Sequence, residues 1–178
     1  MRVITGSARG RRLVTPEGMD VRPTVDKVKE GVFSAIQFDI DGRRVLDLFA
    51  GSGQLGIEAL SRGAETAVFV DNNASSISAV KQNIKACGFE DQAKVINSDA
   101  VSYITSTNEV FDIAFIDPPY HKDIIHSLMP KLCERMSDYG IIVCEHAGDE
   151  PLSDCYGKFA VQKTYKYGKV FVAVYRAV

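Results

Sequence analysis

The fold of this chain is decided by residues 45–56, which read VLDLFAGSGQLG. The stretch begins as a short apolar run typical of a buried strand, breaks into a glycine-rich loop and resumes at Leu55 as a helical pattern. Glycines let the backbone approach a ligand closely, and the free N–H groups of the first helical turn point toward that ligand. A strand, a glycine turn and a helix in this order therefore predict a site for an anion or a nucleotide.

Strand and helix patterns alternate along the rest of the chain. Short apolar runs predict strands at 44–48, 67–70, 94–97, 111–116 and 140–144, and a closing antiparallel hairpin at 159–166 and 170–176. Apolar residues at helical spacing predict helices between them, at 55–62, 73–87, 100–105 and 124–136. Such alternation is typical of an α/β chain with a Rossmann-like, doubly wound and mostly parallel sheet, here of seven strands.

Two features precede the glycine loop. Residues 2–5 and 11–14 predict two short strands around a turn, which would form a small basic β-hairpin. Residues 24–37 carry apolar side chains at helical spacing, with Thr24 as the N-cap. We therefore expect two parts, an N-terminal hairpin arm over residues 1–23 and a main domain over residues 24–178.

The composition is that of an ordinary globular protein, with 178 residues of which 46% are hydrophobic and 25% charged. No apolar run reaches the roughly 18 residues of a membrane helix, and the N-terminus lacks a signal-peptide pattern. We therefore expect a cytoplasmic protein without membrane contact, and we expect it to be a monomer. The cysteines and histidines show no metal-ligand spacing, so we expect no metal site.

The net charge of −2 hides an asymmetry along the chain. Basic residues without any acid occupy both ends: Arg2, Arg9, Arg11 and Arg12 in residues 1–16, and Lys158, Lys163, Lys166, Lys169 and Arg176 in residues 155–178. A basic rim on an acidic body is typical of an enzyme that binds a polyanion. Solvated termini explain the same pattern equally well.

Acidic residues accompany four of the predicted strands. The carboxyl ends of parallel strands meet at one edge of a sheet, and ligands bind there beside the reversal in strand order. One acid at such a position is usually a helix cap, whereas four at successive strands indicate a binding site. These four are Asp47 within the first strand and Asp71, Asp99 and Asp117 after the next three.

The glycine loop matches the G-x-G-x-x-G pattern of dinucleotide-binding proteins through Gly51, Gly53 and Gly56. Asp71 lies about 20 residues after the first glycine, where a carboxylate can bind ribose hydroxyls. Taken literally, the pattern predicts NAD. Asp47 counts against a pyrophosphate because its negative charge lies beside the loop, but it would favour an adenosine ligand with a positively charged amino-acid end. The chain is also short for a dinucleotide domain plus a separate substrate domain.

The sharpest signal is the tetrad Asp117-Pro118-Pro119-Tyr120 after the fourth strand. Each residue before a proline is held extended, and the prolines lack an N–H, so the loop presents oxygen acceptors on a rigid backbone. Two acceptors suit an exocyclic –NH2 group, whose two hydrogens need two partners. Tyr120 could then stack on the attached base. A rigid turn after a buried strand is the alternative interpretation.

In this order the motifs resemble those of class I S-adenosylmethionine-dependent methyltransferases. Over nearly the whole chain they resemble the RsmD-type family, which methylates the exocyclic N2 of a guanine in 16S ribosomal RNA. The resemblance rests on residues 22–24, 47–53, 70–72, 98–100, 117–120 and 167–169. It implies a methyltransferase domain over residues 24–178, direct in-line displacement of the methyl group and S-adenosylhomocysteine as product. The implied partner is ribosomal RNA or the small ribosomal subunit.

The resemblance also implies a role for each matching residue. Cofactor binding would use Asp47 near the methionine end, Gly51 and Gly53 in the loop, Asp71 with Asn72 at the ribose, and Asp99 with Ala100 at the adenine. The catalytic residues would be Asp117 and Pro118, which would hold the target amine, with Tyr120 against the base. RNA contacts would come from Arg9, Arg11 and Arg12, while Arg22 and Thr24 would close the cofactor side or meet the RNA.

Three other functions stay open at this point. The D-P-P-Y tetrad is shared with methyltransferases that act on adenine N6 of DNA or RNA, so it does not by itself select guanine. The glycine pattern keeps an NAD(P)-dependent oxidoreductase open, although the D-P-P-Y loop argues against it. A non-catalytic RNA-binding module on the same scaffold is the third, and the presence of both Asp71 and Asp117 speaks against it.

Overall fold

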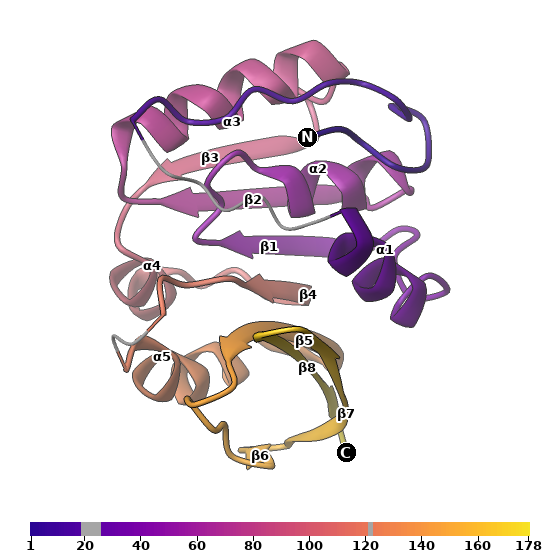
Figure 1. Ribbon diagram of the computed structural model, residues 1–178. Coiled ribbons are helices and arrows are strands. Elements are labelled where there is room, and N and C mark those ends of the chain that lie inside the picture. Colours follow the sequence, from indigo (N-terminus) through magenta and orange to yellow (C-terminus); the bar gives the residue numbers. More distant parts are fainter. Residues whose placement is uncertain (19–25, 121–122) are drawn as a thin grey trace.

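Residues 1–18, 26–120 and 123–178 are described by a computed structural model, and they form one eight-stranded sheet covered by helices (Figure 1). The strands are β1 (Arg44–Leu48), β2 (Thr66–Asp71), β3 (Ala93–Asn97), β4 (Phe111–Ile116), β5 (Met136–Ala147), β6 (Cys155–Tyr156), β7 (Phe159–Tyr167) and β8 (Val170–Ala177). The helices are α1 (Asp26–Ala35), α2 (Gln54–Ser61), α3 (Ala74–Cys87), α4 (Ala100–Ser106) and α5 (Ile124–Cys133).

The strand order is β3-β2-β1-β4-β5-β8-β7-β6, and it reverses direction between β1 and β4. Strands β1 to β5 pair in parallel, whereas β8, β7 and β6 join antiparallel beyond β5. The predicted doubly wound, mostly parallel sheet is confirmed. The predicted number of seven strands is wrong by one, because β6 has only two residues and so carries no periodic pattern in the sequence.

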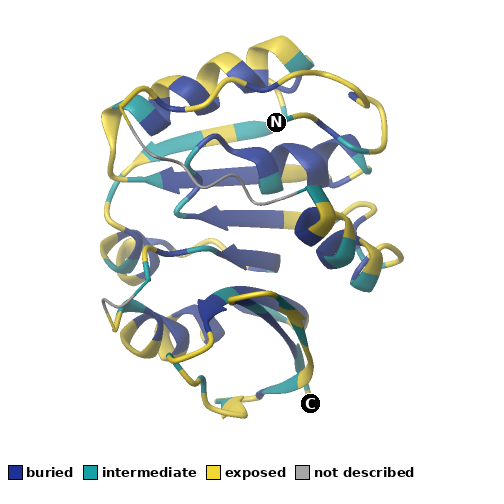
Figure 2. Ribbon diagram, viewed as in Figure 1, coloured by how far each residue is buried: buried dark blue, intermediate teal, exposed yellow. Residues whose placement is uncertain are grey.

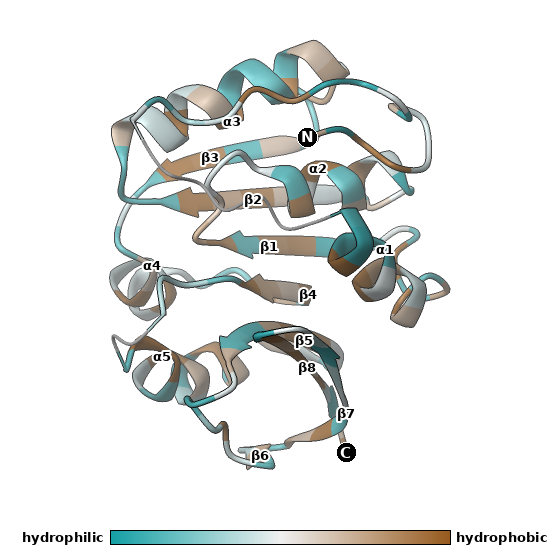
Figure 3. Cartoon of the chain, viewed as in Figure 1, coloured by the Kyte–Doolittle hydropathy of each residue, from teal (hydrophilic) through white to brown (hydrophobic). Residues whose placement is uncertain are grey.

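Alternate residues of the central strands point to two separate cores. Val45 packs with residues of α1, α2 and α3 on one face, and its neighbour Leu46 packs with residues of α4 and α5 on the other. In Figure 2 the central strands β1, β2 and β4 and the inner sides of the helices are mostly buried, and Figure 3 shows the apolar residues concentrated there. Burial on both faces explains why these strands read as continuous apolar runs in the sequence.

The N-terminal segment, residues 1–14, lies against α2 and α3 and does not project from the molecule (Figure 1). The expected pair of strands is reduced to one antiparallel bridge between Arg2 and Arg12, supported by the Val3 N–H donating to the Arg11 carbonyl at 2.9 Å. Asn83 on α3 fastens the segment, since its amide accepts from the Val14 N–H and donates to the Val14 carbonyl. The expected boundary near residue 23 lies outside the described residues.

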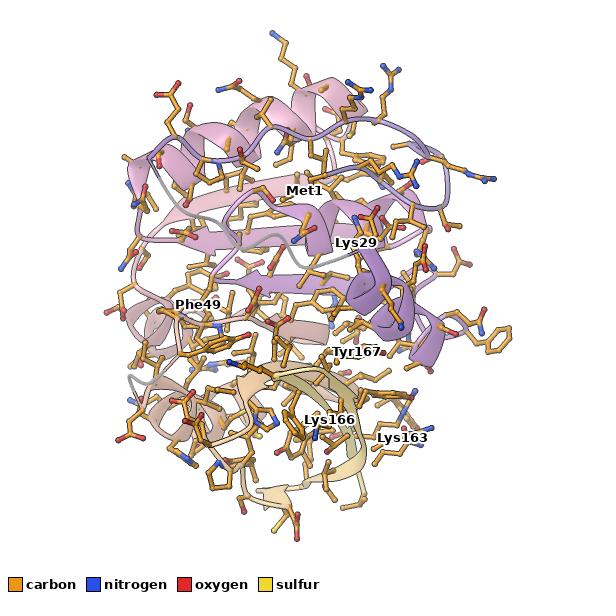
Figure 4. All side chains as sticks on the ribbon, viewed as in Figure 1. Met1, Lys29, Phe49, Lys163, Lys166 and Tyr167 are labelled. Atoms are coloured by element: carbon orange, nitrogen blue, oxygen red, sulfur yellow. The ribbon has the colours of Figure 1, made fainter. Side chains whose placement is uncertain are left out.

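A buried ionic cluster joins this segment to α1 and α2. Glu58 and Lys29 have fully buried side chains whose charged atoms lie 3.6 Å apart, and Arg62 contacts Glu58 at 2.9 Å. The Glu58 carboxylate also accepts the backbone N–H groups of residues 4 and 5, at 2.8 and 3.0 Å. Lys29 donates to the Arg2 carbonyl at 2.5 Å, and its burial lowers the pKa of the ammonium group. Figure 4 labels Lys29 on α1.

Element boundaries differ from prediction mainly around Met136. The sequence predicts it as the last apolar residue of a helix, but α5 ends at Cys133 and Met136 begins β5, where it pairs with Phe111. A single apolar residue fits both periodicities, so its assignment depends on the neighbouring strand.

Candidate active site

The glycine loop lies between β1 and α2 at the carboxyl edge of the sheet (Figure 1). Gly53 is the N-cap of α2 with a φ of 76°, a conformation that a side chain disfavours. At Gly56 a Cβ atom would come within 2.4 Å of the Phe69 ring, so this glycine lets α2 pack closely on β2. The Gly51 N–H donates to the Asp71 carboxylate at 2.9 Å and joins the loop to the tip of β2. Gly51 and Asp71, which the sequence motif predicts to lie at one site, are therefore in contact.

The tips of β2 and β3 bring the other expected cofactor residues to the same edge. The second Asp71 oxygen accepts from the Asn73 N–H at 2.9 Å, and Asn72 between them is exposed. The Asp71 carbonyl accepts from the Ser98 N–H at 3.0 Å, which places Asp99 beside it. Asp99 caps α4 through the Ser102 N–H at 2.9 Å, and Ala100 is buried behind it. Asp71 and Asp99 therefore accept hydrogen bonds from neighbouring backbone N–H groups, in addition to any contact with a ligand.

Asp47 is a buried carboxyl, 2% exposed, at the centre of this edge. Its Oδ2 accepts from the Gly56 N–H at 2.8 Å, so it fastens β1 to the first turn of α2. Burial raises the pKa of this carboxyl from its ordinary value of 3.8 to about 7, the Gly56 N–H lowers it and the nearby Asp71 adds to the increase. A buried carboxyl of this kind would be ionised most readily when a positively charged ligand group lies beside it.

This raised pKa predicts a pH dependence of stability. Because the folded carboxyl binds protons more tightly than the unfolded one, its contribution is fully present below pH 4 and is lost as the pH rises through about 7. Asp47→Asn keeps an oxygen for Gly56 but cannot ionise. We expect wild type to lose on the order of 3 kcal/mol more stability than Asp47→Asn between pH 4 and pH 8. Urea unfolding of both proteins at the two pH values measures this difference, and equal losses would contradict the assignment.

The D-P-P-Y loop follows β4 directly. Asp117 is partly exposed, Pro118 is buried and Tyr120 is partly exposed, with its hydroxyl donating to Glu145 at the end of β5. Burial, followed by the charges of Glu145 and Asp47, raises the pKa of Asp117 well above its usual range, and a hydrogen bond joins the Asp117 and Glu145 side chains. The loop therefore lies near Asp47, at the same edge of the sheet as the glycine loop.

Glu145 and Phe49 are two residues of this edge that the sequence analysis missed. The pairing Asp47–Phe115 and Phe115–Val143 places Asp47, Asp117 and Glu145 on one face of three adjacent strands. Glu145 directly follows the predicted strand 140–144, so the rule that found the other acids could have found it. Phe49 has a φ of 62°, unusual for a bulky residue, and it directly follows β1 (Figure 4). No sequence pattern marks that conformation.

The expected RNA contacts lie in different places. Ser7 and Ala8 bind Ser61, the last residue of α2, at 2.8 and 2.9 Å. Because α2 begins at the glycine loop and has eight residues, the turn that carries the exposed Arg9 lies roughly 12 Å from that loop. The exposed Arg11 and Arg12 follow this turn, and the chain then returns toward the loop, where Asn83 binds the carbonyls of both Val14 and Ser52. Arg22 and Thr24 lie outside the described residues.

A groove of about 520 Å³ opens beside Tyr120 instead. Its lining includes Lys166, Lys169 and Phe171 of the β7–β8 pair, and Figure 4 shows Lys166 there. In the described ranges no three His, Cys, Asp or Glu side chains are arranged as metal ligands, and no helix among them is long and apolar enough to cross a membrane.

Comparisons with known proteins show the family to which this chain belongs. Residues 1–176 match a family model described as "Conserved hypothetical protein 95". The chain is 41% identical over 181 residues to the Bacillus subtilis "Putative rRNA methyltransferase YlbH", with 99% of this chain and 98% of that protein covered. It is 35% identical over 158 residues to "Ribosomal RNA small subunit methyltransferase D" of Haemophilus influenzae, with 85% and 81% covered.

Solved structures described as methyltransferases share the fold of this chain. The Escherichia coli structure described as "Putative methyltransferase yhhF" has a TM-score of 0.88 and 28% identity, covering 99% of this chain and 97% of that one. A more distant structure, described as complexed with SAH, shares the fold at a TM-score of 0.73 and 16% identity, covering 84% of this chain and 49% of that one.

Proposed function

This chain belongs to the RsmD-type family of methyltransferases, and from that membership we propose that it methylates the exocyclic N2 of a guanine in small-subunit ribosomal RNA. Its relatives are ribosomal RNA methyltransferases by name, and its methyl donor is S-adenosylmethionine. The proposal extends these statements to the atom that receives the methyl group.

One observation supports the choice of an amino group as acceptor. Asp117 and Pro118 follow β4 next to the reversal in strand order, at the same edge of the sheet as Asp47 and the glycine loop. A carboxylate and the carbonyl of a residue held by a following proline are two fixed acceptors. They would bind both hydrogens of an –NH2 group and direct its lone pair away from the loop, toward the donor methyl.

The reaction requires little more than this alignment. The N2 lone pair forms the new N–C bond as the S–C bond breaks, and the bonding electrons pass to sulfur, which becomes the neutral thioether of S-adenosylhomocysteine. The extra proton on N2 then passes to the carboxyl pair of Asp117 and Glu145 or to water. Alignment of two reactants can supply roughly 7–11 kcal/mol of the barrier, so a strong base is not needed.

The cofactor would occupy the edge of the sheet from β1 to β3. Asp47 would lie beside the positively charged methionine end, with Gly51 and Gly53 forming the floor under the ligand. Asp71 and Asn72 would bind the ribose hydroxyls, where the Asp71 carboxylate now accepts two backbone N–H groups. Asp99 and Ala100 would flank the adenine. The groove beside Tyr120 would then be available to the RNA.

The test is methyl transfer to small ribosomal subunits from a strain that lacks this protein. S-adenosylmethionine labelled in the methyl group is added with the wild-type protein, and the RNA is digested to nucleosides. We expect the label in N2-methylguanosine. Label in N6-methyladenosine would show that adenine N6, and not guanine N2, receives the methyl group. Absence of label in the RNA would contradict the whole proposal.

The arginine turn gives a second prediction. Because the turn lies away from the glycine loop, changes in it should alter RNA binding without altering methyl transfer. Changing Arg9, Arg11 and Arg12 together to Gln should weaken RNA binding about tenfold and reduce the salt slope of log Kd by up to about 3. Turnover at saturating RNA should stay unchanged. The control changes Lys27, Lys81 and Lys131 to Gln, three exposed lysines on separate helices. Equal RNA affinity and salt slope in the two triple variants would mean that the three arginines are solvated surface residues that do not bind RNA.

A further inference from the structure

Two carboxyl groups lie side by side at the tips of β4 and β5, although an amine needs only one of them. Ile116 and Cys144 are paired neighbours in the two parallel strands, so the next residues, Asp117 and Glu145, are adjacent on the same face. Their side chains are hydrogen-bonded to each other. Tyr120 donates its hydroxyl to Glu145 and fixes the second carboxyl beside the first.

The edge of guanine differs from that of adenine next to the amino group. In guanine the ring nitrogen beside the N2 amine carries a hydrogen, so the edge offers two adjacent donors, N1–H and N2–H. In adenine the ring nitrogen beside the N6 amine is a bare acceptor. Enzymes that act on an unstacked base read this edge by hydrogen bonds.

We propose that Glu145 accepts the N1–H of the target guanine while Asp117 accepts one N2–H, so that the carboxyl pair selects guanine over adenine. This inference rests on the proposed function and assigns its base specificity to a residue outside the D-P-P-Y tetrad. An ionised carboxylate has about four acceptor sites, so Glu145 can bind the Tyr120 hydroxyl, Asp117 and one further donor. Tyr120 is then a positioning residue for Glu145.

Adenine would be rejected by the same group. Its bare ring nitrogen would face the Glu145 carboxylate, and two acceptors cannot hydrogen-bond each other. A site built to bind a donor discriminates against an analogue that lacks it, because its acceptor then faces a second acceptor and loses that hydrogen bond. The D-P-P-Y loop alone would accept the amine of either base, so the choice between guanine and adenine depends on Glu145 of β5.

The test uses 2-aminopurine at the target position of the RNA. This base keeps the N2 amine but has a bare N1 in place of N1–H. For wild type we expect kcat/KM to fall about 100-fold from guanine to 2-aminopurine. In Glu145→Gln the amide can donate to the bare nitrogen, and in Glu145→Ala the acceptor is absent. In both variants we expect the guanine to 2-aminopurine ratio to fall below about fivefold.

Two further variants separate recognition from structure. Tyr120→Phe keeps the ring but frees Glu145, and its ratio should lie between those of wild type and Glu145→Ala. Asp154→Asn removes an exposed carboxylate outside the groove beside Tyr120 and should keep the wild-type ratio. Thermal unfolding and S-adenosylmethionine affinity confirm that each variant is folded. A variant that loses activity on both bases with an unchanged ratio would overturn the inference, as would a wild type that methylates both bases equally.

Failure of the proposed function gives a different result. If wild type transfers no methyl group to the guanine-containing RNA, or methylates adenine in it, the proposed function fails and this inference falls with it. If guanine is methylated but the ratio does not depend on Glu145, only the role of Glu145 is overturned.

Discussion

Asp117→Ala is expected to lower kcat by roughly 10³-fold while S-adenosylmethionine affinity stays within about threefold of wild type. In the proposed function this carboxyl would be one of two acceptors that align the amine with the methyl group, and it lies on β4's side of the strand reversal, whereas the glycine loop follows β1. Stability should not fall, because burial already disfavours the charged form of this carboxyl and raises its pKa. Single-turnover kinetics, calorimetric cofactor binding and urea unfolding measure the three quantities separately.

Two companion variants sharpen this result. Asp117→Asn keeps one oxygen acceptor in place and should retain more activity than Asp117→Ala. Asp138→Ala removes a carboxylate near the start of β5 and should leave kcat unchanged; its side chain is 89% exposed. Near wild-type turnover in Asp117→Ala would show that Asp117 does not bind the target amine. A parallel loss of cofactor affinity would show that Asp117 serves the cofactor instead.

Glu58→Ala should have the largest effect on stability, a loss of about 3–5 kcal/mol. The change leaves the Lys29 ammonium, which is fully buried, without its carboxylate partner. It also removes the acceptor for the N–H groups of residues 4 and 5. Both effects act on the contact between the N-terminal segment and α2. Urea unfolding at pH 7 gives the free energy, and hydrogen exchange should show lost protection at Ile4 and Thr5.

The matched control for this change is Glu65→Ala, just beyond the same helix. Glu65 is exposed, and a surface substitution of this kind should shift stability by no more than about 0.5 kcal/mol. A loss below about 1 kcal/mol in Glu58→Ala would mean that the ionic cluster does not hold the segment in place. Unchanged exchange at Ile4 and Thr5 would lead to the same conclusion.

The sequence predicted those features that local patterns determine. The strand and helix order followed from apolar periodicity, and the G-x-G-x-x-G loop followed from backbone conformations that only glycine adopts easily. The position of Asp47, Asp71, Asp99 and Asp117 at one edge followed from the geometry of a parallel sheet. The same geometry applies to Glu145, which directly follows the predicted strand 140–144 but was not counted among these acids.

Features that depend on distant segments could not be predicted. The burial of Lys29 and Glu58 requires the backbone of residues 2 to 5, which contacts a helix more than 50 positions away. Periodicity counts both residues as polar and places them on a solvated face. The arginine turn likewise reads as an arm that could meet the RNA near the target, and only its contacts with Ser61 place it at the far end of α2.

The most direct test of the central claim is a crystal structure of the protein with S-adenosylhomocysteine and an RNA that contains the target. We predict that the guanine N2 lies within hydrogen-bond distance of both the Asp117 carboxylate and the Pro118 carbonyl, with the cofactor sulfur on its open side. A base bound elsewhere, or an Asp117 and Pro118 corner turned away from the sulfur, would contradict the account.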